Sequence, residues 1–92
     1  MIVRFTTGSH FSPTVQSQVD IFRNKTQMRK KNPFFTGLEP LDISAKNAAR
    51  MVEENGGEKV TIVFDGYLPE DRQDIVLGPF RKRNLTISRN IC

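Results

Sequence analysis

Residues 44–65 read SAKNAARMVEENGGEKVTIVFD and contain the two clearest periodicities of the chain. The first half repeats small apolar residues at the i, i+3, i+4 and i+7 spacing of one helix face: Ala45, Ala48, Ala49 and Val52. The second half alternates apolar with other residues, as a half-buried strand does: Val60, Ile62 and Phe64. Gly56-Gly57 separates the two elements, and Asp65-Gly66 ends the second. Because neither element can bury its apolar side alone, we predict that the two sets face each other across one core.

Weaker patterns extend the prediction toward the N-terminus. Residues 1–6 are rich in β-branched and aromatic side chains and predict a strand. Ser12-Pro13 is a typical helix start and predicts a helix that runs to about residue 29. Apolar residues follow that start at helical spacing: Val15, Val19 and Phe22. Residues 34–40 predict a loop, and Asp42 or Ser44 is the expected cap of the next helix.

The last third of the chain predicts two further strands. They cover residues 75–77 and 85–91 and are joined across residues 78–84, which contain Gly78-Pro79. The fold class that follows is α+β, a two-layer sandwich in which a mixed sheet of about four strands carries two helices on one face. A chain of 92 residues has room for one core, so we predict that residues 1–92 form a single domain.

Charge is sorted along the sequence into three blocks. Residues 1–38 carry six Lys or Arg against one acid, residues 39–74 carry nine acids against four cations, and residues 75–92 carry four cations and no acid. A surface selected only for solubility would intersperse the two signs. The sorting predicts one basic and one acidic face, with a partner for at least one of them.

Two basic clusters lie next to phenylalanines and favour a nucleic-acid partner, either RNA or DNA. The first cluster is Arg29, Lys30 and Lys31, followed by Phe34 and Phe35. The second cluster is Arg81, Lys82 and Arg83, preceded by Phe80. Cations neutralise phosphates, and a neighbouring ring can stack on an unpaired base. Our first hypothesis is therefore a small basic nucleic-acid-binding protein that contacts phosphates through both clusters, with Phe34 or Phe35 as the stacking platform.

A protein-interaction module is the alternative hypothesis. In that case the chain is a regulatory subunit or an inhibitor of a larger enzyme, and its segregated acidic and basic faces orient it on an acidic protein surface. Attraction between unlike blocks also allows self-association into a homo-oligomer.

An acidic group near the end of the best strand raises a third hypothesis, a metal-dependent hydrolase. The group consists of Asp65, Glu70, Asp71 and Asp74. Val63-Phe64-Asp65-Gly66, with Pro69 after it, resembles a short stretch of the flap-endonuclease branch of the PIN-like nucleases. The resemblance implies no catalytic residue here, because such enzymes need further acids on other strands and the first 38 residues contain only Asp20. We predict that the chain is not an enzyme.

Cysteine, histidine and hydropathy bound the remaining possibilities. Cys92 is the only cysteine and His10 the only histidine, which excludes an intramolecular disulfide and leaves a thiolate zinc site or a catalytic triad unsupported. We therefore predict no catalytic residue, no metal and no cofactor. No apolar run is long enough to span a membrane and no signal-peptide pattern is present, so we predict a cytoplasmic protein without a membrane partner.

Overall fold

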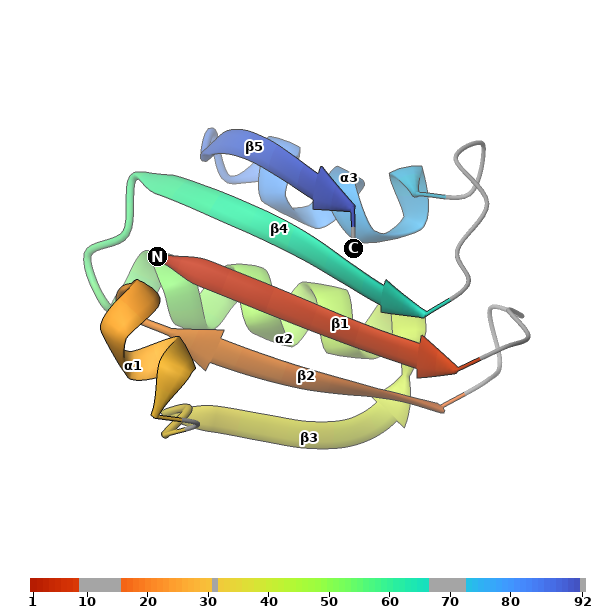
Figure 1. Ribbon diagram of the computed structural model, residues 1–92. Helices are drawn as coiled ribbons and strands as arrows, with labels where there is room; N and C mark the ends of the chain where they lie inside the picture. Colours follow the sequence, from red (N-terminus) through yellow and green to blue (C-terminus); the bar gives the residue numbers. More distant parts are fainter. Residues whose placement is uncertain (9–15, 31, 67–72, 92) are drawn as a thin grey trace.

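In the part of the chain that the structure describes, five strands form one mixed sheet (Figure 1). The computed structural model describes residues 1–8, 16–30, 32–66 and 73–91. The strands are β1 (Ile2–Gly8), β2 (Gln16–Phe22), β3 (Phe35–Pro40), β4 (Lys59–Gly66) and β5 (Thr86–Ile91). Their order in space is β3-β2-β1-β4-β5. Strand β2 is antiparallel to both of its neighbours, whereas β1, β4 and β5 run parallel to one another.

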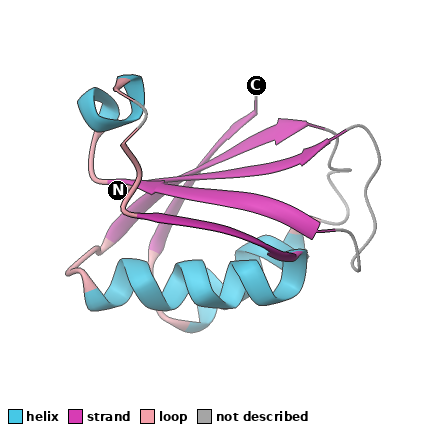
Figure 2. Cartoon of the chain, turned by 90° about the horizontal axis from the view of Figure 1, so that it is seen from below, coloured by secondary structure: helices cyan, strands magenta, loops and turns pink. Residues whose placement is uncertain are grey.

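The described residues form three helices, which are divided unequally between the two faces of the sheet. Helix α2 (Leu41–Glu54) lies between β3 and β4 in the sequence, and α3 (Asp74–Lys82) lies between β4 and β5. Both pack against the same face of the sheet, while the short helix α1 (Lys25–Arg29) lies on the other face (Figure 2). The face that α2 and α3 leave uncovered is called the open face below.

The main core lies between the sheet and helices α2 and α3. Ala48 and Ala49 of α2 are fully buried there together with Ile62 and Phe64 of β4, so the predicted pairing of the two periodic elements is confirmed. Phe5 of β1 stands in the middle of this core, with the ring of Phe64 centred 6.3 Å away. The alanine stripe lets α2 approach the sheet closely, because each methyl group occupies little space.

A second, smaller apolar cluster lies on the open face beneath α1. It consists of Ile2, Phe22 and Val63 from three neighbouring strands, and Met28 of α1 packs against it. Alternation along β2 explains the two clusters, since Val19 and Ile21 point into the main core and Phe22 points to the opposite face. The sheet therefore buries part of both faces.

The predicted helix from Ser12 to about residue 29 is wrong for the part that the structure describes. Residues 16–22 form strand β2, and only residues 25–29 are helical. The helical spacing of Val19 and Phe22 coincides with a strand alternation in which Ser17, Val19 and Ile21 share one face. Pairing with both β1 and β3 selects the strand.

Three other local predictions are also wrong. The expected loop at residues 34–40 forms the edge strand β3, and the expected strand at 75–77 with its turn at 78–84 lies mostly in helix α3. Pro40 precedes α2 without a side-chain cap, whereas Asp42 lies in the first turn and Ser44 is buried. The α+β class is confirmed, but in the described residues the sheet has five strands instead of about four, and a third, short helix lies on the second face.

Candidate nucleic-acid interface

Helix α1 is held in place by two side-chain amides. Asn24 precedes the helix in an extended conformation, and its Oδ1 accepts a hydrogen bond from the backbone N–H of Gln27 at 2.8 Å. The Oε1 of Gln27 in turn accepts from the backbone N–H of Arg23. An isolated helix of this length is unstable in water, so these caps and the contact of Met28 with the small cluster fix its position.

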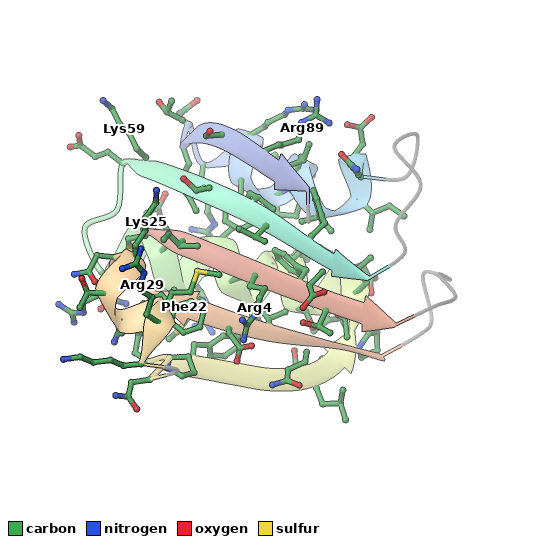
Figure 3. The ribbon with its side chains drawn as sticks, viewed as in Figure 1. Arg4, Phe22, Lys25, Arg29, Lys59 and Arg89 are labelled. Atoms are coloured by element: carbon green, nitrogen blue, oxygen red, sulfur yellow. The ribbon has the colours of Figure 1, made fainter. Side chains whose placement is uncertain are left out.

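Four exposed cations lie in this helix or directly beside it in the sequence. We call them the α1 basic surface: Arg23, Lys25, Arg29 and Lys30. Residues 21–38 contain no acid, and among the described residues none of the four cations forms an ion pair. Lys25 and Arg29 extend from α1 on the open-face side of the sheet (Figure 3). The positive charge of this surface is therefore uncompensated in the part of the chain that the structure describes.

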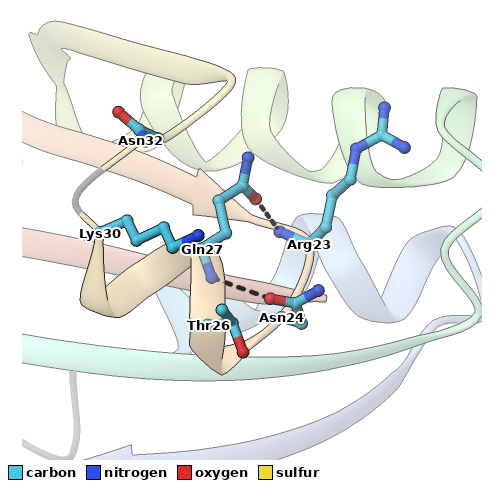
Figure 4. A pocket seen from close by; sticks show the side chains of 6 residues that line it. All are labelled: Arg23, Asn24, Thr26, Gln27, Lys30 and Asn32. Carbon is cyan, nitrogen blue, oxygen red and sulfur yellow. Dashed lines mark hydrogen bonds between the residues drawn. The ribbon is translucent and has the colours of Figure 1, made fainter.

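A shallow pocket of about 350 Å³ opens beside α1 (Figure 4). We call it the α1 pocket, and it is lined by Arg23, Asn24, Thr26, Gln27, Lys30 and Asn32. Every lining side chain is polar, and two of them carry a positive charge. The pocket therefore suits a small anionic group.

The two phenylalanines predicted to stack on bases are half-buried. Phe34 and Phe35 both pack against the main core. The guanidinium carbon of Arg23 lies 5.7 Å from the centre of the Phe34 ring, which is a cation–π distance. The partly covered ring of Phe34 thus contacts Arg23, which is one of the residues that line the α1 pocket.

The second predicted cluster, Arg81, Lys82 and Arg83, lies at the end of α3 on the opposite face of the sheet. We call it the α3 basic cluster. Arg81 forms an ion pair with Asp74 at 3.1 Å, and Arg83 forms one with Glu53 of α2 at 2.8 Å. Lys82 and Arg83 also line a shallow pocket of about 320 Å³ with Lys46 and Pro79. Acids of α2 and α3 therefore partly compensate this cluster.

The structure places α1 and α3 on different faces of the sheet, so the two clusters do not share one surface (Figure 2). Lys30 lines the α1 pocket and Arg29 is exposed in the last turn of α1, whereas Lys31 falls outside the described residues. The sequence reasoning missed Arg23, Asn24 and Gln27. A signal was available, because Asn24 followed three residues later by Gln27 is the spacing of a helix-capping pair.

The acidic group proposed for a metal site is only partly described. Glu70 and Asp71 lie outside the described residues, Asp65 is exposed in β4, and Asp74 pairs with Arg81 in α3. Within the described ranges, no group of three or more histidine, cysteine or acidic side chains is arranged to hold a metal ion.

Comparison with known proteins gives no functional assignment, so the proposal below is based on the geometry of the structure. No protein family matches this chain, and no curated protein matches it in sequence. In the described part of the chain, none of the helices combines the length and the apolar character needed to cross a bilayer.

Proposed function

We propose that this protein binds nucleic acid, RNA or DNA, by contacting backbone phosphates through the α1 basic surface. The observation that carries the proposal is the group of four exposed cations that have no carboxylate partner among the described residues. By contrast, Arg81 and Arg83 at the end of α3 are partly neutralised by ion pairs with Asp74 and Glu53. Uncompensated cations attract polyanions and release counterions on binding.

The first test removes charge from the α1 basic surface. We expect the variant Lys25→Ala/Arg29→Ala/Lys30→Ala to bind a short oligonucleotide about tenfold more weakly or worse near 0.1 M salt. The slope of log affinity against log salt should fall by about two to three, because each phosphate contact releases close to one counterion. Fluorescence anisotropy over a salt series measures both quantities, and the melting temperature should stay nearly constant because exposed cations contribute little to folding.

The control for that variant is Lys46→Ala/Arg50→Ala, which removes two cations from another surface. Both residues are exposed on α2, on the opposite side of the sheet from α1. The control should keep nearly the wild-type salt slope. A wild-type protein without measurable oligonucleotide affinity at low salt would rule out the proposed function.

A protein-interaction module is the second candidate, and one observation favours it. Leu38 on the edge strand β3 is 65% exposed and Ile43 in the first turn of α2 is 46% exposed, although both are large apolar side chains. An exposed strand edge with apolar neighbours is a typical place for another protein chain to add. Under this reading the partner binds at β3, and the α1 variant leaves its binding unchanged.

A further inference from the structure

The two large apolar side chains that are exposed in the described residues both lie at the β3 edge of the sheet. Leu38 belongs to β3 itself, and Ile43 lies in the first turn of α2, directly after that strand. Asn47, one helical turn after Ile43, donates to the carboxylate of Glu39 in β3 at 2.9 Å. Residues four apart share one helix face, so Ile43 lies on the side of α2 next to β3. The exposed apolar surface of the described residues is thus concentrated at one edge.

Most of strand β3 has no feature that protects a sheet edge. An edge strand presents unpaired N–H and C=O groups, and charges, prolines, bulges or covering elements normally keep other chains away from them. Residues 35–38 contain no charge and no proline, and their register with β2 runs without a shift. Figure 1 shows β3 as the outermost strand, with no described element beyond it. The other edge strand, β5, carries the exposed Arg89. The β3 edge is therefore open to a further strand.

The charges at the two ends of β3 favour a second copy of this chain as the added strand. The boundary between the basic block (residues 1–38) and the acidic block (residues 39–74) falls within β3. At its first end, Phe34 precedes the strand and the guanidinium of Arg23 lies over the Phe34 ring. At its other end lies Glu39. A second β3 that runs antiparallel would set each Arg23 near the Glu39 of the other copy, whereas a parallel one would bring like charges together.

We infer that the protein forms a homodimer in which two β3 strands pair antiparallel and join the two sheets into one. Such a contact has a two-fold axis, so unlike charges meet at both of its ends. Leu38 lies near the middle of β3, and side chains that are opposite or diagonal across two strands pack on each other. The Leu38 side chains of the two copies therefore cover each other. This inference does not depend on nucleic-acid binding, and it names the chain that adds at the β3 edge.

Sedimentation equilibrium of the purified protein without nucleic acid tests the dimer. We expect a monomer–dimer equilibrium with a dissociation constant of about 100 µM or below, the weak range of a small interface. A wild-type protein that stays monomeric at about 0.5 mM overturns the inference, and the partner at β3 would then have to be a different protein. Species larger than a dimer that grow with concentration also overturn it, because a two-fold contact closes on itself.

The variant Leu38→Lys tests whether β3 is the contact. Lysine on an edge strand opposes pairing, and two lysines near the two-fold axis repel each other. We expect the dissociation constant of the dimer to rise at least about tenfold, with the melting temperature nearly unchanged because the position is exposed. The matched control Ser88→Lys adds the same side chain at an exposed position of the other edge strand and should stay within about twofold of the wild type. Equal effects of the two variants would overturn the inference.

The single variants Arg23→Glu and Glu39→Lys test the antiparallel arrangement. In a homodimer of either variant like charges meet at both ends, so each alone should dimerise about fivefold more weakly or worse near 0.05 M salt. An equimolar mixture should return to within about threefold of the wild type, because the heterodimer restores unlike charges at both ends. Melting temperatures of the separate variants check that both are folded. A mixture that associates no better than either variant alone would overturn the inference.

Discussion

Arg4 and Asp20 connect two strands on the open face of the sheet. Arg4 of β1 donates from its Nη2 to the Oδ2 of Asp20 on β2 at 3.0 Å, in register with it. The Arg4 guanidinium also lies 5.4 Å from the centre of the Phe22 ring (Figure 3). Asp20 is only 3% exposed, so its charge depends on this cation and on its other contacts. Burying a carboxylate without a cation would be costly.

We predict that Asp20→Ala lowers the free energy of unfolding by about 2 kcal/mol, because it leaves the half-buried Arg4 without its carboxylate. Urea denaturation measures the change. The double variant Arg4→Met/Asp20→Leu should recover at least half of the loss, since the neighbours Phe22 and Val63 are apolar. A double variant as unstable as the single one would show that the pair is needed for more than charge compensation.

At the scale of elements, the sequence predicts a segment correctly where only one periodicity is present. Strands β4 and β5 and helix α2 each show one periodicity, strand β1 is indicated by its β-branched and aromatic residues, and all four predicted elements are confirmed. Strand β2 is compatible with two periodicities. Val19 and Phe22 have helical spacing, whereas Val19 and Ile21 have strand spacing. The pairing of β2 with β1 and β3 selects the strand. Such pairing joins residues far apart in the sequence, so local patterns do not contain it.

The candidate site also has features that the sequence reveals and features that only the fold determines. The cations Arg29 and Lys30 are visible in the sequence, and both are exposed in the structure. The separation of α1 from α3 depends on the sheet order, which the sequence does not reveal. The two hydrogen bonds by which the Asn24 and Gln27 side chains hold α1 in place exist only once the helix has formed.

Helix α3 was missed because Gly78-Pro79 is a typical turn signal. Pro79 nevertheless lies inside the helix, whose buried residues Val76, Leu77 and Phe80 share one face. Gly78 makes this tolerable, because a Cβ before a proline would clash with the proline ring in helical conformation. Apart from its chain neighbours and the nearby backbone of α3 itself, nothing lies within 4 Å of a Cβ built on Gly78. The helix forms because the burial of its apolar face outweighs the unfavourable proline.

We predict that Pro79→Ala stabilises the protein by about 1–2 kcal/mol, because it restores a helical N–H and removes the ring from the helix interior. Urea denaturation again measures the change. Gly78→Ala alone should give no gain, whereas Gly78→Ala added to Pro79→Ala should contribute roughly a further 0.5–1 kcal/mol. A destabilising Pro79→Ala would mean that the packing of Pro79 outweighs its helical cost.

At the scale of the whole molecule, the sheet separates two sets of cations. The protein measures 30 × 29 × 20 Å, with α1 on one face and α3 on the other. The α3 basic cluster has Asp74 and Glu53 as partners, whereas the α1 basic surface has no acid in residues 21–38. An oligonucleotide bound along α1 therefore interacts with the α3 basic cluster only through long-range electrostatic attraction. At physiological salt the Debye length is about 8 Å, well below the dimensions of the molecule.

This difference predicts how a second triple variant responds to salt. Arg81→Ala/Lys82→Ala/Arg83→Ala should weaken oligonucleotide binding by less than about threefold near 0.15 M salt, because screening removes long-range attraction. Near 0.01 M salt the Debye length grows to about 30 Å, so the variant should then lose clearly more affinity than at high salt. Anisotropy titrations of this variant and of Lys25→Ala/Arg29→Ala/Lys30→Ala at both salt concentrations provide the comparison. Equal losses from the two triple variants at 0.15 M salt would instead mean that the strand wraps around the end of the sheet and contacts both faces. In that case the α3 basic cluster would be part of the binding site, despite its ion pairs with Asp74 and Glu53.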